Sequence, residues 1–173
     1  DSGKIIHASD LVIGITQSGE TAETIKALEY AKNKKAKTIA VVEKSSSQAS
    51  IISDLTINIG SGSEYAVAST KTFTSTTISL YILSKYIYSK KQNIDFDHND
   101  IVKELEELND KVALILNDQH KIKEISKEFS KLKHILFLGR DIMYPVAMEG
   151  ALKMKEVCYI HAEGYPAGEM KHG

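Results

Sequence analysis

The sequence has 173 residues, of which 42% are hydrophobic and 26% are charged, and its formal net charge at pH 7 is −1. These values are ordinary for a globular protein with one good core or two small ones. Lys and Arg form no basic block, and no apolar run approaches the roughly 18 residues that span a bilayer, which argues against nucleic-acid and membrane partners.

The first part of the chain predicts alternating strands and helices. Three apolar runs are typical of buried parallel strands, and between them lie a longer segment and a short one with helical spacing. In chain order these segments are 11–15 (strand), 22–34 (helix), 37–42 (strand), 47–53 (helix) and 55–59 (strand). This alternation favours an α/β fold, in which a parallel sheet is covered by helices on both faces.

The turn Thr16-Gln17-Ser18-Gly19-Glu20-Thr21 joins the first strand to its helix. Hydroxyls and an amide therefore gather at a helix N-terminus, where free backbone N–H groups and the helix dipole favour an anion such as phosphate. The alternative is an ordinary helix start with Ser18 as the N-cap, Gly19 relaxing the turn and Glu20 in the first helical turn. The turn by itself does not decide between the two.

Glycine breaks the third strand at Gly60-Ser61-Gly62 and opens a polar loop. A dinucleotide-binding fingerprint is rejected, because the third glycine is absent and the pair follows the wrong strand. The segment 70–90 is predicted to be a long, deeply packed helix. After a polar linker over 91–97, helical spacing predicts amphipathic helices over 101–116 and 119–132.

A strand over 135–138, closed by Gly139, restarts the strand-turn-helix pattern. Pro145 suits the first turn of a following helix that is predicted to reach about Ile160. On this helix Glu149, Lys153 and Glu156 have i, i+4, i+7 spacing and share one stripe. The stripe is either a solvated Glu-Lys pair of small energetic value or the lining of a wet cleft.

The residues from 161 to 173 are predicted to form a loop dense in titratable groups, where catalytic side chains often lie. A carboxylate, an ammonium and histidines suit proton transfer next to a sugar carbonyl. The histidines lack metal-ligand spacing, so no metal and no cofactor are predicted. The single cysteine, Cys158, is expected to be a buried, inert thiol. No signal-peptide pattern is found at the start, and a cytoplasmic location is expected by default.

These motifs resemble the isomerase part of the glutamine–fructose-6-phosphate aminotransferase family, also called glucosamine-6-phosphate synthases. The first motif is shared by the wider sugar isomerase (SIS) superfamily, whereas the last ones together are specific to this family. The resemblance runs in order over almost the whole chain, through Thr16–Thr21, Val67–Lys71, Glu149–Glu156, His161–Glu163 and Ala167–Gly173.

The resemblance implies a three-layer αβα, flavodoxin-like SIS domain, a helical connector and the start of a second SIS domain. The corresponding boundaries are 1–90 for the first domain, which lacks its first strand, 91–132 for the connector and the start of the second unit, and 133–173 for the opening of the second domain. It also implies a homodimer that acts in amino-sugar biosynthesis with fructose 6-phosphate and glucosamine 6-phosphate.

The same resemblance implies the roles of individual side chains. The substrate and its phosphate are expected on Gln17, Ser18 and Thr21, and on Thr16, where the family usually has Ser. The sugar pocket is expected to be lined by Val67 and Ser69.

The catalytic roles that the resemblance implies fall on three residues. Glu156 is the expected base that moves a proton between C1 and C2, and Lys153 is its partner on the sugar hydroxyls. His172, reaching across from the neighbouring subunit, is expected to assist ring opening.

Three features of that family are not in this sequence: the glutaminase domain, the first strand of the first SIS domain and the C-terminal lysine that forms a Schiff base. We therefore expect a fragment that is inactive alone. Two other functions stay open, a non-catalytic sugar-phosphate sensor and a different SIS isomerase. A sensor needs the phosphate cradle but no base such as Glu156.

Overall fold

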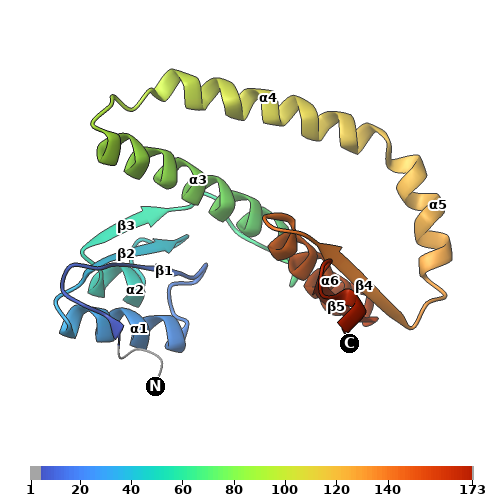
Figure 1. The fold of residues 1–173 in the computed structure, drawn as a ribbon, viewed down its shortest axis with the longest axis horizontal. Helices are drawn as coiled ribbons and strands as arrows, with labels where there is room; N and C mark the ends of the chain where they lie inside the picture. The colour runs from blue at the N-terminus through green and yellow to red at the C-terminus, as the bar shows by residue number, and fades with distance from the viewer. Residues whose placement is uncertain (1–4, 173) are drawn as a thin grey trace. The chain divides into compact units, whose positions relative to one another are not determined.

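The computed structural model describes residues 5–172 of the chain (Figure 1). The chain divides into two compact units, Asp1–Phe96 and Asp97–Gly173. Each unit has its own parallel strands and helices and is described by itself below. The finer boundaries at 90 and 132, with a connector and an incomplete second domain, stay a prediction.

The first unit is built on a three-stranded parallel sheet with strand order β1-β2-β3. The central strand β2 is buried over five of its six residues, as expected for a strand with neighbours on both edges and helices on both faces. The predicted strands and helices are confirmed to within two residues at each end. Their bounds are β1 (Leu11–Ile15), α1 (Ala22–Asn33), β2 (Lys37–Val42), α2 (Gln48–Ile52), β3 (Leu55–Asn58) and α3 (Thr70–Gln92).

Two small cores cover the two faces of this sheet, because successive strand residues point to opposite sides. On one face Ala40 and Val42 pack with Leu28 of α1 and with α2. On the other face Ile39 and Val41 pack with Ile59, and Leu80 of α3 lies against them. Figure 1 accordingly shows α1 and α2 on one side of the sheet and α3 on the other.

The deep packing predicted for α3 is wrong. Among the residues described, only Thr72 and Ser89 of this helix are buried, and Phe73 is 44% exposed. On this helix Leu80 packs against the core of that sheet face, whereas large side chains such as Tyr88, 58% exposed, remain at the surface.

The second unit contains two helices followed by a strand-helix-strand motif. The predicted helices and the first strand are confirmed, and the bounds are α4 (His98–Asn117), α5 (Gln119–Phe129), β4 (His134–Gly139), α6 (Met143–Cys158), β5 (His161–Pro166) and the short 3-10 helix η2 (Met170–His172). The strands β4 and β5 pair in parallel, and α6 covers one face of the pair.

The loop predicted from residue 161 onward is partly wrong, because its first six residues form β5. The residues of β5 that face α6 are small: Ala162 is 1% exposed, and a Cβ on Gly164 would lie 2.7 Å from the Cα of Met148. The helix therefore approaches the strand closely. Small residues of this kind carry no apolar alternation, so the strand was not visible in the sequence.

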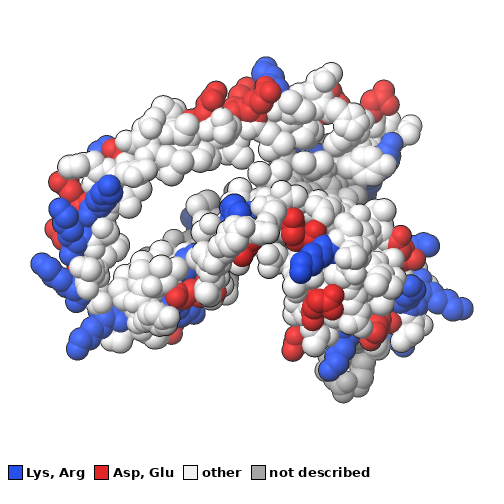
Figure 2. Space-filling model, turned by 180° about the vertical axis from the view of Figure 1, so that it is seen from behind, with Lys and Arg blue, Asp and Glu red and all other residues white. Residues whose placement is uncertain are grey.

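Acidic and basic side chains lie interspersed over much of the face shown in Figure 2, in keeping with the near-zero net charge. Among the residues described, none of the helices combines the length and the apolar character needed to cross a membrane.

Candidate functional site

The turn after β1 is held by a hydrogen bond between two of its own hydroxyls. Thr16 is 8% exposed, and its Oγ1 lies 2.7 Å from Oγ1 of Thr21. Thr21 is the N-cap of α1, so the interpretation of Ser18 as the cap is wrong. The Ser18 Oγ instead accepts a hydrogen bond from the Glu20 N–H at 3.1 Å, within the turn.

This pairing affects the start of α1. The Thr21 hydroxyl is bonded to Thr16, and no side chain within the described residues caps the first turn of the helix. The N-terminal N–H groups of α1 are thus left for water or for a ligand, and the positive end of the helix dipole lies among the hydroxyls of the turn. An anion can bind at such a helix start.

Gly19 is required at its position for two reasons. Its φ is +72°, in the left-handed region, and a Cβ placed there would lie 2.0 Å from Oγ of Ser47. The carbonyl of Gly19 also accepts a hydrogen bond from the Ala49 N–H at 3.0 Å, and the Glu20 Oε1 accepts one from the Gln48 N–H at 3.0 Å. The turn is therefore packed directly onto the start of α2.

A cavity of about 450 Å³ opens beside this turn, at the carboxyl ends of the strands. Open α/β sheets bind their ligands at this end. The cavity is lined by Gln17, Ser18, Glu43, Lys44, Gly62, Ser63 and Glu64. Of the predicted binding residues, Gln17 and Ser18 line it, while Thr16 and Thr21 belong to the same turn without lining it.

Two carboxylates of this cavity, which the sequence analysis did not single out, shape its rim. The Glu43 carboxylate accepts hydrogen bonds from Ser61 and Gly62, and the Ser61 hydroxyl is the largest cause of a lowered Glu43 pKa. The Glu64 Oε2 accepts hydrogen bonds from the N–H and the hydroxyl of Thr72, at 3.0 and 3.1 Å, and so caps α3. The only signal available beforehand was that Glu43 directly follows a buried strand.

Val67 and Ser69, predicted to line the sugar pocket, lie outside the residues that line this cavity. Val67 is 82% exposed. Ser69 has φ +51° and ψ +41°, a left-handed conformation that costs a residue with a side chain about 1 kcal/mol or more. It is the N-cap of α3, yet within the described part of the chain its hydroxyl makes no capping bond.

In the second unit, Lys153 lies between two carboxylates on α6. Its Nζ is 2.6 Å from Oε2 of Glu156 and 3.3 Å from Oε1 of Glu149, and each of the three side chains is about a quarter exposed, at 25–27%. The hydrogen bond to Glu156 is the main reason that the Lys153 pKa is raised. The ammonium therefore stays protonated, and the three side chains are partly shielded from solvent.

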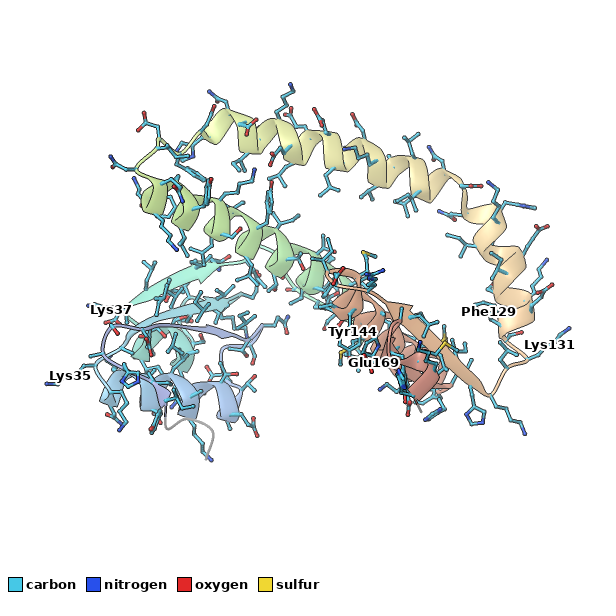
Figure 3. The ribbon with its side chains drawn as sticks, in the orientation of Figure 1. Lys35, Lys37, Phe129, Lys131, Tyr144 and Glu169 are labelled. Atoms are coloured by element: carbon cyan, nitrogen blue, oxygen red, sulfur yellow. The ribbon has the colours of Figure 1, made fainter. Side chains whose placement is uncertain are left out.

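The predicted titratable loop is divided between the two ends of the β4–β5 pair. His161 lies at the amino end of β5, in register with His134, with 3.2 Å between their Nδ1 atoms. His172 lies in η2, beyond the carboxyl ends of the strands, and is exposed. Glu169, labelled in Figure 3, precedes η2 and accepts a backbone hydrogen bond from His172 at 2.9 Å.

The prediction of a buried Cys158 is wrong, since this residue is exposed. It is the last residue of α6 and lines an apolar groove of about 610 Å³ with Met154 and with Phe129 of α5, labelled in Figure 3. The buried residues Ala147 and Ala151 lie on the same side of α6, and Cys158 is exposed because it ends the helix. The apolar neighbours of Cys158 in the sequence did not indicate that the packed part of the helix ends before it.

With this geometry in place, the chain can be compared with known proteins. The sequence model of the SIS domain family matches residues 4–85 and 128–173. Glutamine–fructose-6-phosphate aminotransferase (isomerizing) of Aquifex aeolicus is 44% identical over 97% of the chain, and that of Caldanaerobacter subterraneus is 42% identical over 98%. The solved C-terminal domain of glucosamine-fructose-6-phosphate aminotransferase from Francisella tularensis is 39% identical with a TM-score of 0.84 over 98% of the chain.

The matches extend over only part of these longer proteins. The chain spans 27% and 28% of the length of the two curated relatives, and 49% of the solved C-terminal domain.

Proposed function

This chain belongs to the SIS domain family, and we propose that it is the part of a glutamine–fructose-6-phosphate aminotransferase (isomerizing) that binds fructose 6-phosphate and converts the ketose to an aldose on the way to glucosamine 6-phosphate. The observation that carries the proposal is the turn after β1. There the hydroxyls of Thr16 and Thr21 are bonded to each other, the first turn of α1 has no side-chain cap within the described residues, and a cavity opens beside it.

In the first unit, the turn binds the phosphate of the sugar. Ser18 and Thr21 donate hydrogen bonds to phosphate oxygens, and Gln17 binds the adjacent part of the substrate. Thr16 is buried and bonded to Thr21, and we propose that it donates that hydrogen bond, so that it holds the Thr21 hydroxyl in place and leaves the Thr21 proton for the phosphate. Val67 and Ser69 line the pocket for the sugar. Hydrogen bonds to a charged group are the strong ones, which suits a small set of hydroxyls to this task.

In the second unit, α6 performs the proton transfer. The Glu156 carboxylate removes the proton from C1 of the open-chain ketose, so that a C1–C2 double bond forms and the C2 carbonyl oxygen becomes an enediolate oxygen. The hydroxyl proton of O1 then passes to O2, the C1=O double bond forms, and Glu156 returns its proton to C2. Lys153 stays protonated beside Glu156 and donates to the substrate oxygens, where it stabilises the enediolate. His172 assists ring opening, a step that precedes the proton transfer.

The assembly around this chain is part of the same proposal. We propose a homodimer in which His172 serves the neighbouring subunit, a glutaminase domain that supplies ammonia in the full-length protein, and a cytoplasmic location. No metal or cofactor is needed for the isomerisation as written, because a carboxylate, an ammonium and an imidazole supply the proton movements.

Removing the hydroxyls of the phosphate turn tests the proposal directly. Ser18→Ala together with Thr21→Val is expected to weaken fructose 6-phosphate binding at least about tenfold in a calorimetric titration, because two hydrogen bonds to a charged group are lost. The matched control is Ser84→Ala with Thr77→Val, whose hydroxyls donate hydrogen bonds to carbonyls of their own helix, at 2.7 and 2.9 Å. Equal affinity of the two double variants would return the turn to an ordinary helix start.

Ser69→Gly separates binding from stability at the start of α3. Glycine relieves the left-handed strain of this position, about 1 kcal/mol, but it loses nearly as much in conformational entropy on folding. No capping bond is lost, so the free energy of unfolding is expected to change by less than about 0.5 kcal/mol. Fructose 6-phosphate binding is expected to weaken several-fold, because the pocket loses a hydroxyl. A loss of stability with unchanged affinity would make Ser69 a structural residue. Urea unfolding and the same titration measure the two effects.

A further inference from the structure

Glu43 connects the three loops at the carboxyl end of the first sheet. It follows β2 directly, and its backbone N–H donates a hydrogen bond to the carbonyl of Gln17 at 3.0 Å, in the turn after β1. Its own carbonyl accepts one from the side-chain amide of Asn58, at the end of β3. The backbone of Glu43 is thus fixed on both sides by the loops that border the cavity.

The Glu43 side chain holds the third loop, residues 60–64, which we term the cavity loop. Its Oε2 accepts hydrogen bonds from the N–H and the hydroxyl of Ser61, at 2.8 and 2.9 Å, and its Oε1 accepts one from the N–H of Gly62 at 2.9 Å. Gly60 and Gly62 have φ of +63° and +68°. A loop with two left-handed glycines has many accessible conformations, so an external contact is needed to select one.

The other charged groups around Glu43 act on the same loop. Lys71 donates a hydrogen bond to the carbonyl of Ser63 at 2.7 Å and attracts the Glu43 carboxylate. Lys44 and Glu64 line the same cavity. The two Glu43 carboxylate oxygens accept hydrogen bonds from three donors of the cavity loop. These bonds fix the part of the cavity wall that this loop forms, while Ser18 lines the same cavity from the turn after β1.

We propose that Glu43 is a positioning residue, which as a carboxylate holds the cavity loop in the conformation that admits a sugar phosphate beside Gln17 and Ser18. This inference rests on the proposed function, since it assigns to Glu43 an effect on the binding of that substrate. Glu43 itself does not touch the phosphate, which its negative charge would repel. It acts through Ser61 and Gly62.

The ionisation of Glu43 sets the pH range of this effect. The Ser61 hydroxyl, then the Ser61 and Gly62 N–H groups, hold the Glu43 pKa below its ordinary value of 4.5. For a carboxyl with a lowered pKa in the folded state, the stabilisation is complete above the ordinary value and is lost as the pH falls through the lowered pKa. The cavity loop is therefore held throughout the neutral range and released only in acid.

Glu43→Gln is the sharpest variant, because it keeps the shape of the side chain and removes one acceptor. Whichever way the amide is turned, its NH₂ group faces an N–H donor, so the three hydrogen bonds cannot all form. The matched control is Asp54→Asn. Asp54 Oδ2 accepts hydrogen bonds from the N–H and hydroxyl of Thr38, at 2.8 and 3.1 Å. That carboxylate lies near the amino end of β2, the end marked by Lys35 and Lys37 in Figure 3.

The experiment combines a titration with an NMR measurement on the whole chain. Calorimetry at pH 7 measures fructose 6-phosphate affinity, which is expected to fall about tenfold in Glu43→Gln and to stay unchanged in Asp54→Asn. Amide chemical shifts of Ser61 and Gly62 are followed from pH 7 to 3. In the parent and in Asp54→Asn they are expected to titrate together with a midpoint below 4.5, and in Glu43→Gln this titration is expected to be absent.

The outcomes separate this inference from the proposed function. A parent that binds, with equal affinity in Glu43→Gln, overturns the positioning role while leaving the proposed function standing. A parent that binds no fructose 6-phosphate overturns the proposed function and the positioning role together. The amide titration then still reports whether Glu43 holds the loop, and its absence from the parent overturns the hydrogen-bonded arrangement itself.

Discussion

Glu156→Gln is expected to lower the rate of conversion of fructose 6-phosphate to glucose 6-phosphate by about 10²- to 10⁴-fold, the range that a positioned general base contributes. The amide cannot accept the C1 proton. It keeps the size of the carboxylate, and Lys153 retains Glu149 at 3.3 Å, so no charge is left unpaired and the fold is expected to persist. The KM is expected to change little, because the substrate contacts of the ground state remain.

The assay for this variant uses this chain joined to the remaining isomerase segments of its Aquifex aeolicus relative, because the chain spans 27% of that protein's length. The matched control is Glu163→Gln on β5, where the carboxylate is exposed and lies 3.5 Å from Nε2 of His161. Its rate is expected to equal that of the parent. If Glu156→Gln isomerises as fast as Glu163→Gln, Glu156 is not the base. If neither the parent nor Glu163→Gln isomerises, a non-catalytic sugar-phosphate sensor becomes the better function.

Gly19→Ala is expected to lower the free energy of unfolding of the first unit by about 2–4 kcal/mol, the sum of backbone strain and overpacking. At φ +72° the alanine is strained, and its Cβ would lie 2.0 Å from Oγ of the buried Ser47. Relief of this clash requires α2 to move away from the turn, and the hydrogen bond from the Ala49 N–H to the Gly19 carbonyl would then lengthen. Urea unfolding monitored on the first unit measures the loss.

Gly62→Ala separates the two causes of this destabilisation. Gly62 also has a left-handed φ, of +68°, but no atom within the described residues lies within 4 Å of a Cβ built there. Its variant therefore carries only the strain, about 1–2 kcal/mol. The same loss in both variants would mean that the contact with Ser47 relaxes without cost and that the turn is not fixed by α2.

Much of the first unit follows from local patterns. The apolar runs of β1 and β2 and the helical spacing of α1 are properties of short segments, and short segments carry the periodicity that predicts strands and helices. The turn from Thr16 to Thr21 was located in the same way, because it lies where one periodicity ends and another begins. What the turn does could not be read from it, since a cap and an anion site use the same residues.

Contacts between segments distant in the sequence decided the rest. The sequence by itself determined the α/β class, the position of the phosphate turn and the stripe of Glu149, Lys153 and Glu156, because these depend on spacing along one segment. Only the tertiary structure assigned β5 to a strand, left Cys158 exposed at the end of α6 and directed Glu43 to the cavity loop, because each depends on which segments approach from elsewhere in the chain. The hydrogen bond between Thr16 and Thr21 depends on both the local sequence and the fold. Its partners are only five residues apart, yet their hydroxyls come within 2.7 Å only in the folded turn. In the described chain the start of α1 then has no side-chain cap.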